Sequence, residues 1–389
     1  MPNILDADKL RTYLLRKKIY DFLFDNLFLY RVIRECLSIF SALKKKTIPN
    51  RKREYRNYYV LDANPIIVMT MESMVDLEFF SEIVGQRPAY FLKLFPWTKE
   101  SFVEMYQDFV FYKQHQKKYP RHKIFFLCNT RLEKKLADFF DIPAIWCNHN
   151  CFLDERIYIP RENSQKQFDI IYNARLDPAK RHYLLAQLPS IALILGPNVN
   201  ISDEIRKYKQ AIRTILPDAV IANDPALIKL SECQSDDFDF PLLPSSDVVS
   251  VVNQSYVGVI LSREEGACYA SAEYLLCGLP VVSTKNLGGR DVFLLDEPFV
   301  KFVRSQPGKI KDAVEELKHL KISSHEIRES TLFKIRQHRE RFQVLVQQIY
   351  NESGRSDFDV KRNWDKIFIN KMIVFGQKWP DSFIEALRR

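Results

Sequence analysis

Two glutamates in the C-terminal half of the chain stand where both could contact one ligand. Glu265 follows the apolar run at 257–261, and Glu273 lies eight positions further on, in a helical segment that ends at Gly278. An ionised carboxylate only accepts hydrogen bonds, so it suits the hydroxyl groups of a sugar. Four residues between the glutamates would present backbone amides at the start of this helix: Gly266, Ala267, Cys268 and Tyr269. Because such amides bind phosphate, the segment predicts a ligand with sugar on both sides of a diphosphate.

Further candidates lie where other predicted strands end. The run at 191–195 ends at a loop containing Gly196 and Asn198, and the run at 280–283 leads to Thr284. Ligands of open α/β sheets bind at the carboxyl ends of the strands. We therefore add these three residues to the candidate binding site.

Composition excludes several classes of protein. Of the 389 residues, 46% are hydrophobic and 13% are aromatic, so the chain can bury a large core and is not intrinsically disordered. Ten glycines are too few for a collagen-like or Gly-rich repeat fold. The formal net charge of +9 favours a polyanionic partner. No nucleic-acid-binding motif accompanies that charge, so we do not expect a nucleic acid.

The cysteines indicate a reducing compartment. There are seven of them, scattered and without a Cys-x-x-Cys pair, which makes a zinc knuckle or a redox dithiol a poor interpretation. Asp236 and Asp237 are interpreted as part of an acidic surface loop, so we expect no metal and no cofactor. The N-terminus lacks the apolar stretch of a signal peptide, and no run is long enough to span a membrane. We expect a cytoplasmic protein, either soluble or peripheral on the inner face of the membrane.

The order of apolar and polar segments predicts the fold class. Short apolar runs alternate with helical segments over 60–160 and again over 168–350, with a polar break at 161–167. This alternation is typical of parallel sheets with helices on both faces. We therefore predict an α/β protein with two Rossmann-like, doubly wound domains that face a cleft. Residues 351–389 are predicted to be C-terminal helices that cross back to the first domain.

Residues 1–59 are predicted to be a basic, amphipathic helical extension. Apolar and aromatic side chains surround a polar stripe between Asp21 and Leu43, and a cluster of Lys and Arg follows at 44–56. One interpretation is a helix that lies on an anionic membrane. The other is a helix that covers a sheet edge, followed by a solvated charged loop that includes Arg56.

The segment around the two glutamates resembles the retaining GT-B glycosyltransferases of family 4. Their signature is a Glu-x7-Glu pair followed by a Gly-x-Pro-Val-Val strand, and Glu265, Glu273 and Gly278-Leu-Pro-Val-Val282 match it. Gly288 and Gly289 fit the glycine pair of that family. The resemblance implies that Glu265 contacts the hydroxyls of the transferred sugar and that Glu273 binds the ribose. It also implies that the amides at 266–269 face the diphosphate.

A second match lies upstream, after the run at 169–173. Arg175 and Lys180 have the spacing of the basic pair of this family, although Ala174 replaces the usual glycine. The resemblance implies that both cations neutralise the leaving diphosphate. Two fixed cations can stabilise that developing charge without a metal.

The resemblance is weaker in the first domain. The Gly-Gly loop of the family is missing, and its nearest counterpart is the turn that contains Glu72. The N-domain histidine of the family has no clear counterpart, and the matching strand carries Lys93 instead. Asn148 and His149 lie in the connector between the predicted domains. We consider His149 either a site residue or a hinge residue with an ordinary hydrogen bond.

The resemblance implies a retaining glycosyltransferase that moves a hexose-type sugar from a nucleotide-diphosphate sugar to a glycan or glycolipid. Bacterial surface polysaccharide or lipopolysaccharide assembly is the family-level expectation. Two alternatives remain open. One is a non-catalytic subunit that docks on a membrane glycan-assembly complex through residues 1–59, and the other is an epimerase or hydrolase of nucleotide sugars.

Overall fold

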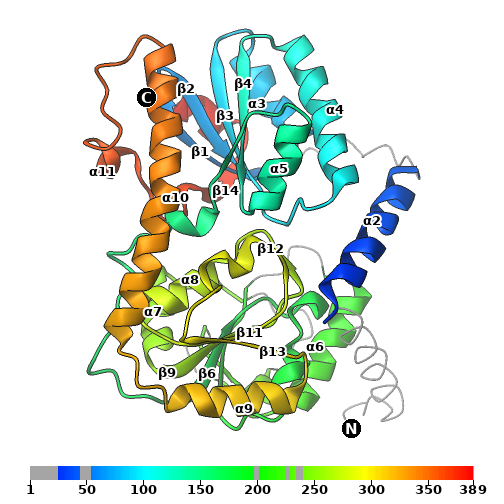
Figure 1. Cartoon of the computed structure of the whole chain (residues 1–389), viewed down its shortest axis with the longest axis vertical. Helices are drawn as coiled ribbons and strands as arrows, with labels where there is room; N and C mark the ends of the chain where they lie inside the picture. The colour runs from blue at the N-terminus through cyan, green and yellow to red at the C-terminus, as the bar shows by residue number, and fades with distance from the viewer. Residues whose placement is uncertain (1–24, 44–53, 197–200, 224–227, 234–239, 389) are drawn as a thin grey trace. The chain divides into compact units, whose positions relative to one another are not determined.

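The structure is a computed structural model that describes residues 25–43, 54–196, 201–223, 228–233 and 240–388 (Figure 1). The chain divides into two compact units. Unit 1 contains Glu155–Glu264 and Cys268–Leu332 together with the described chain up to Tyr30. Unit 2 contains Arg31–Asp154, Glu265–Ala267 and Phe333–Arg389. Asn198, Asp236, Asp237 and the basic residues at 44–53 lie outside the described residues.

Unit 1 is built on a parallel sheet of six strands in the order β13-β11-β9-β6-β7-β8. When the six strands are numbered 1 to 6 along the chain and the sheet is read from β8 to β13, the order is 3-2-1-4-5-6, which is that of a Rossmann fold. The order reverses between β6 and β9, so the loops after these two strands open a crevice at the carboxyl edge of the sheet. The strands are β6 (Phe168–Asn173), β7 (Ile191–Ile194), β8 (Val220–Ile221), β9 (Ser255–Ile260), β11 (Val281–Thr284) and β13 (Val300–Val303).

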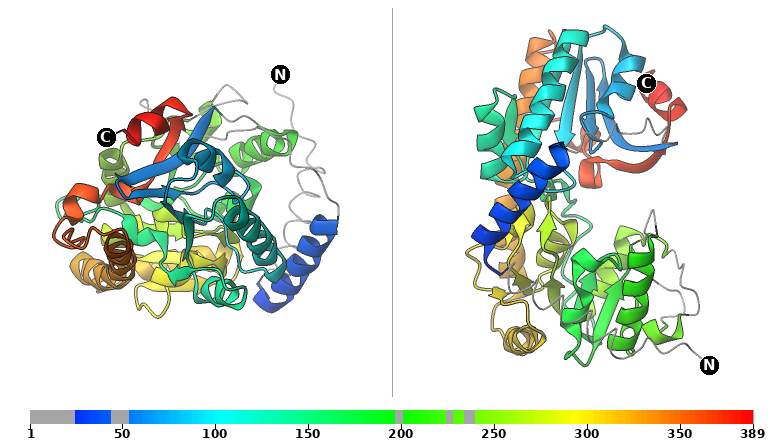
Figure 2. Two further views of the ribbon diagram at one scale, coloured as in Figure 1. Left: turned by 90° about the horizontal axis from the view of Figure 1, so that it is seen from above. Right: turned by 90° about the vertical axis from the view of Figure 1, so that its right-hand side faces the viewer.

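Helices cover both faces of this sheet, as the apolar strands require. Residues of alternating position on β6, β7 and β9 form one core with α6 (Asp203–Ile215) and α9 (Pro307–Lys318). On the opposite face, α7 (Ser245–Asn253) and α8 (Tyr269–Leu276) contact β9. Figure 2 shows these helices on either side of the strands. Four short 3-10 helices complete unit 1: η2 (Pro178–Lys180), η3 (His182–Leu185), η4 (Leu230–Glu232) and η5 (Gly289–Phe293).

Unit 2 is built on a mixed sheet in the order β14-β1-β2-β3-β4-β5. The last four strands are parallel, while β1 pairs antiparallel with both β2 and β14. The strands are β1 (Tyr55–Ala63), β2 (Ile66–Thr70), β3 (Ala89–Leu94), β4 (His122–Cys128), β5 (Ala144–Trp146) and β14 (Val374–Lys378). The crossover helices are α3 (Leu77–Val84), α4 (Phe102–Lys118) and α5 (Arg131–Phe139).

The two faces of the unit 2 sheet are covered from different parts of the chain. The three crossover helices and α12 (Asp381–Ala386) share one core with the strands. On the other face the long helix α10 (Ser324–Glu352) reaches the sheet through Tyr350, whose hydroxyl donates to Asp62 Oδ2 at 2.8 Å. Ser353, just past the helix, bonds the Tyr90 hydroxyl at 3.1 Å. The second layer therefore comes from the C-terminal part of the chain.

The remaining elements are short or peripheral. β10 (Glu264–Glu265) and β12 (Leu287–Gly288) form a two-stranded sheet. The connector after β5 carries η1 (His149–Phe152), and the C-terminal segment carries α11 (Trp364–Ile367) and η6 (Asn370–Met372). α2 (Leu27–Leu43) is the described part of the predicted extension. No described helix is long and apolar enough to cross a membrane.

The α/β class and the two Rossmann-like domains are confirmed. The units differ from the predicted ranges, because Glu265–Ala267 joins unit 2 and the chain returns to unit 2 at Phe333. Residues 351–389 were expected to be helical, but β14 is a strand that extends the sheet beside β1. Its sequence, Val-Phe-Gly-Gln-Lys, has no apolar run, so only pairing with an edge strand identifies it.

Arg56 corrects the expectation of a solvated charged loop. β1 begins at Tyr55, inside the predicted extension, and the Arg56 side chain on it is buried. The Arg56 guanidinium pairs with Asp76 at 2.9 Å and with Glu72 at 3.4 Å. A buried cation is tolerated when carboxylates and hydrogen bonds satisfy it. The partners of Arg56 lie 16 and 20 residues further along the chain, so the local sequence pattern does not predict its burial.

Buried neutral histidines make the fold sensitive to acid. His182 is fully buried in unit 1, beside the rings of Tyr172 and Tyr208, and its Nδ1 lies 3.2 Å from the Tyr208 hydroxyl. Burial lowers the pKa of His182 to about 3. The unfolded chain has the ordinary histidine pKa, so it binds more protons than the folded chain as the pH falls through that value. Stability is therefore lost on acidification.

We expect His182→Asn, which keeps an acceptor but cannot take up a proton, to lose less stability between pH 7 and pH 5 than the wild type. The difference in lost unfolding free energy should be about 2 kcal/mol, from one histidine titrating near its unfolded pKa. Urea denaturation of both proteins at the two pH values measures it. Equal losses in both proteins would show that His182 is not the acid-sensitive group.

Candidate functional site

The carboxyl edge of the unit 1 sheet gathers most of the predicted binding residues. Arg175 and Lys180 follow β6, Gly196 follows β7, and Thr284 ends β11. Because all six strands are parallel, their carboxyl ends meet at one edge. The order reversal of the sheet lies between β6 and β9, where such folds bind their ligands. We define this set of loops as the carboxyl-edge site.

Two buried arginines that sequence reasoning missed organise this edge. Arg181 donates through Nε to the Leu261 carbonyl at 2.5 Å and through a terminal nitrogen to Thr284 Oγ1 at 2.5 Å. Arg290 donates to the Ser262 carbonyl at 2.5 Å and also to the Thr284 carbonyl. Both side chains are at most 1% exposed. They satisfy the backbone carbonyls where β9 and β11 end, and Arg290 is also ion-paired with Asp291 at 2.7 Å.

Thr284 ends β11, and its part in ligand binding stays a prediction. Its hydroxyl is fully buried and bonds Arg181, and it also lies 3.4 Å from the Leu261 carbonyl. In this structure Thr284 holds the strand ends in place. Nothing in the sequence separates Arg181 from an exposed arginine, because the polar residues Lys180 and His182 flank it.

Arg175 reaches across the edge over Gly196. A Cβ atom at Gly196 would lie 2.9 Å from Arg175 Cγ, which is too close, so the glycine makes room for the arginine side chain. Within the part of the chain that the structure describes, the Arg175 guanidinium forms no ion pair. A partly exposed guanidinium in this position suits an anionic ligand oxygen, which it can bind in a bidentate manner.

Glu273 lies on α8, where its side chain is 2% exposed. The helix is seated by Tyr274, whose hydroxyl accepts from the Asn173 backbone amide at 2.6 Å. Tyr274 also occupies the space that a side chain on Gly258 would need. The Asn173 side-chain amide lies 3.5 Å from Glu273 Oε2, so the carboxylate stands at the end of β6. Glu273 and the loop that carries Arg175 thus meet at the carboxyl-edge site.

The start of α8 has an unusual backbone conformation. Cys268 is the N-cap residue, and its φ of 72° is left-handed, a conformation that non-glycine residues rarely adopt. Its side chain does not cap the helix. Backbone strain of this kind is concentrated at functional positions.

The tripeptide Glu265–Ala267 packs in unit 2, against the residues that follow β3. A Cβ atom at Gly266 would lie 2.2 Å from the Phe95 carbonyl oxygen, so only glycine permits this approach. The Asn150 side-chain amide donates to the Ala267 carbonyl at 3.3 Å. The Asn129 side-chain amide donates to the same Phe95 carbonyl at 3.0 Å. Glu265 itself is 7% exposed.

The three predicted residues of unit 2 are engaged in its internal structure. The Asn148 side chain caps η1, because its Oδ1 accepts from the Asn150 backbone amide at 3.0 Å. The Asn148 backbone amide donates to His338 Nδ1 at 3.2 Å. His149 is buried, and burial lowers its pKa to about 3, which keeps the imidazole neutral. Glu72 pairs with Arg56 and accepts from the Asn57 amide at 2.9 Å. Their part in ligand binding stays a prediction.

Several titratable groups outside the predicted set have shifted pKa values, and two of them lie next to predicted residues. Lys93, at the end of β3, is 3% exposed and donates through Nζ to the Glu72 carbonyl at 2.5 Å. Burial lowers its pKa to about 8, although Asp108 opposes that shift. Burial also raises the pKa of Glu264, next to Glu265, to about 7. Groups of this kind gather at functional sites, so both join the candidates.

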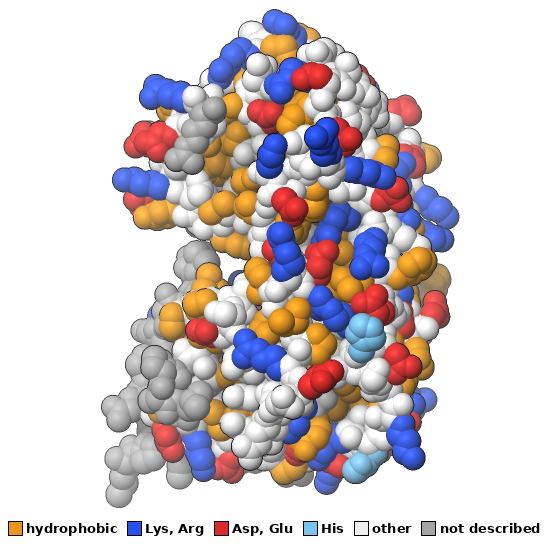
Figure 3. Space-filling view, turned by 90° about the vertical axis from the view of Figure 1, so that its left-hand side faces the viewer, with side chains coloured by type: hydrophobic (Ala, Val, Ile, Leu, Met, Phe, Trp, Pro, Cys, Tyr) orange, Lys and Arg blue, Asp and Glu red, His pale blue; other side chains and the backbone are white. Residues whose placement is uncertain are grey.

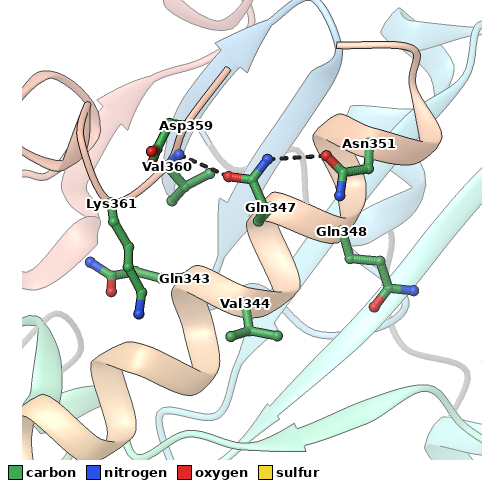
Figure 4. Close-up of a pocket in the computed structure, with 8 residues that line it drawn as sticks. All are labelled: Gln343, Val344, Gln347, Gln348, Asn351, Asp359, Val360 and Lys361. Carbon is green, nitrogen blue, oxygen red and sulfur yellow. Dashed lines mark hydrogen bonds between the residues drawn. The ribbon is translucent and has the colours of Figure 1, made fainter. Parts of the chain in front are cut away.

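A pocket on the outer side of α10 in unit 2 involves none of these residues (Figure 4). Gln347 crosses it, donating to Asn351 Oδ1 at 3.1 Å and accepting from the Val360 amide at 2.9 Å. Its polar groups are thus satisfied internally. Among the described residues, no group of three or more His, Cys, Asp or Glu side chains is placed to hold a metal ion.

No protein-family model matches the sequence, and comparison with curated proteins gives no match. Solved structures of similar fold include sucrose-phosphate synthase from Thermosynechococcus elongatus, at 12% identity and a TM-score of 0.48, covering 72% of this chain and 77% of that one. The Anabaena protein HepE in complex with UDP and glucose has 14% identity and a TM-score of 0.45, covering 72% and 74%.

A third similar structure is an α,α-trehalose-phosphate synthase (UDP-forming) from Burkholderia vietnamiensis. It has 12% identity and a TM-score of 0.47, and the match covers 80% of this chain and 74% of that one. At these identities the similarity concerns the fold alone.

Two glycine substitutions compare a close contact with backbone atoms, at Gly266, and a close contact with a side chain, at Gly196. We expect Gly266→Ala to lower the unfolding free energy by about 1–3 kcal/mol, because its new methyl group meets backbone atoms that cannot move aside. Gly196→Ala meets only the flexible Arg175 side chain, so its cost should stay below about 1 kcal/mol. Urea denaturation measures both. A Gly266→Ala protein as stable as Gly196→Ala would contradict the described packing of Glu265–Ala267.

We expect the charged Lys93 side chain to lower the free energy of unfolding rather than to raise it. A lowered pKa means that folding disfavours the charged form, so an apolar side chain of similar length removes that penalty. We expect Lys93→Met to unfold at the same or a higher temperature at pH 7, as followed by circular dichroism. A clear drop in unfolding temperature would mean that the lysine is held for structural reasons.

Proposed function

We propose that this protein is a retaining GT-B glycosyltransferase that uses a nucleotide-diphosphate sugar as its donor. The observation that carries the proposal is the carboxyl-edge site of unit 1. There a buried carboxylate on α8 and a loop with three successive cations, Arg175, Lys180 and Arg181, stand at the order reversal of a Rossmann sheet. This set suits a ribose and a diphosphate, the two parts that all such donors share.

We assign a role to each residue from its chemistry. Glu273 accepts hydrogen bonds from the ribose hydroxyls, and the amides at the start of α8 bind diphosphate oxygens. Arg175 and Lys180 stabilise the negative charge that develops on the diphosphate as it leaves. The buried Arg181 adds positive potential without contacting the ligand. Glu265 accepts from hydroxyls of the transferred sugar. Because these cations supply the charge that a metal supplies elsewhere, we propose a metal-independent reaction.

The proposed reaction exchanges one C–O bond for another. The bond between the anomeric carbon and the diphosphate oxygen breaks, and a bond from the anomeric carbon to an acceptor hydroxyl oxygen forms on the same face. The proton of that hydroxyl passes to the leaving phosphate oxygen, so no protein base is required. This accounts for a neutral, buried His149 and for the lack of a family-type histidine in unit 2.

We propose a glycan or glycolipid as the acceptor, with a role in bacterial surface polysaccharide assembly. A glycolipid acceptor would place the enzyme at the inner face of the membrane. UDP and UDP-glucose are the first ligands to test, since the structures of HepE contain them.

The donor site is tested by ligand-induced thermal stabilisation over a panel of UDP-, GDP-, ADP- and CMP-sugars. A ligand that binds only the folded state raises the unfolding temperature by mass action. We expect one base to give a shift that Glu273→Gln abolishes, because the amide replaces an acceptor oxygen by a donor. Glu315→Gln changes a side chain on α9 of the same unit that is 44% exposed; it is the matched control and should keep the shift.

Transfer itself is tested with the donor found in that panel and a mixed glycan or glycolipid acceptor fraction. Arg175→Met should reduce release of the nucleoside diphosphate by about 100-fold, as removal of one charge-stabilising donor does in other enzymes. Arg206→Met, on α6 in the same unit, should leave it unchanged. Donor binding without acceptor-dependent release would instead identify a binding subunit, and release without any acceptor would identify a hydrolase.

A further inference from the structure

The helix α2 is turned the opposite way from most amphipathic helices: its polar side faces the protein. Arg34 bonds both oxygens of Glu104 at 3.1 Å and the Thr98 carbonyl at 3.0 Å. Glu35 accepts from the Val103 amide at 3.0 Å. These partners surround the first turn of α4 in unit 2 (Figure 1). The contacts anchor α2 by hydrogen bonds and ion pairs.

The apolar side of α2 is exposed. Phe28 is 77% exposed, Val32 is 46% exposed and Ile39 is 44% exposed, and these residues follow one another at helical spacing. Leu29 and Cys36 are exposed beside them. We call these five residues the α2 stripe. A stripe of this kind normally faces a core, and an exposed one marks an interaction surface.

The charges of the chain indicate which surface the stripe meets. The ten residues that follow the helix, 44–53, contain six basic residues and no acidic one: Lys44, Lys45, Lys46, Arg51, Lys52 and Arg53. Figure 3 shows another face of the molecule, on which Lys and Arg side chains are mixed with Asp and Glu. An apolar helix face followed directly by a segment whose charged residues are all basic is the combination that binds an anionic lipid surface.

We propose that α2 docks the protein on an anionic membrane, with the α2 stripe inserted among the acyl chains at the interface. The bonds from Arg34 and Glu35 to α4 fix the helix to unit 2 and leave the stripe outward. The six basic residues at 44–53 supply charge opposite in sign to that of lipid phosphates. The described structure thus favours the membrane interpretation of the extension, because the helix contacts α4 through its polar side rather than covering the sheet with its apolar side.

The test is co-sedimentation of the full-length chain with vesicles. We expect binding to vesicles of phosphatidylcholine and phosphatidylglycerol at least about tenfold stronger than to phosphatidylcholine alone. The double substitution Phe28→Glu and Val32→Glu should weaken binding by at least about tenfold, since it places charge on the stripe. The matched control is Phe333→Glu with Val344→Glu, which changes the same two residue types at exposed positions of α10.

Unfolding temperatures of both double variants show whether they fold. A second variant, with Lys44, Lys45 and Lys46 changed to Gln, leaves the helix intact and should remove the preference for anionic vesicles. The proposal is overturned if the wild type stays in the supernatant, or if the stripe variant binds as well as the control. Concentration-dependent dimers that only the stripe substitution abolishes, without vesicle binding, would show that a second copy covers the stripe. Loss of donor binding would not affect these outcomes, so the two proposals fail separately.

Discussion

The carboxyl-edge site depends on the way buried arginine side chains satisfy backbone carbonyls where parallel strands end. In a parallel sheet the last carbonyls of each strand point into the loops, and burying them unpaired is costly. Arg181 and Arg290 bond the carbonyls of Leu261, Ser262 and Thr284, and so join β9, β11 and the loop after β6 into one rigid edge. Arg290 is also ion-paired with Asp291 at 2.7 Å, so of the two arginines Arg181 is the one bonded here to uncharged groups.

The second constraint is the close backbone approach at Gly266. The segment that carries Glu265 follows the sheet of unit 1 in the chain, yet it packs on the Phe95 carbonyl in unit 2. Asn129 and Asn150 hold the two sides of this contact. Glu265 therefore belongs to unit 2, while the flanking residues Glu264 and Cys268 belong to unit 1. The buried Lys93 at the end of β3 lies two residues before the Phe95 carbonyl of this contact.

Much of the fold could be predicted from the sequence because apolar runs such as those of β4 and β11 are continuous and well bounded. Glu273 was proposed because ligands bind at the strand ends of α/β sheets and Arg175 because of the family resemblance, and the part of both in ligand binding stays a prediction. Arg56 and Arg181 could not be placed, because a buried cation looks like a surface one until its distant partners are known. The sequence of β14 has no strand pattern, so only its pairing with β1 identifies it. Tertiary contacts decide all of these cases.

The most direct test of this account is a crystal structure of the protein with its nucleoside diphosphate bound. The account predicts the diphosphate beside Arg175, Lys180 and the first amides of α8, with the ribose hydroxyls on the Glu273 carboxylate. A nucleotide bound elsewhere at saturation, with the carboxyl-edge site empty, would contradict the central claim.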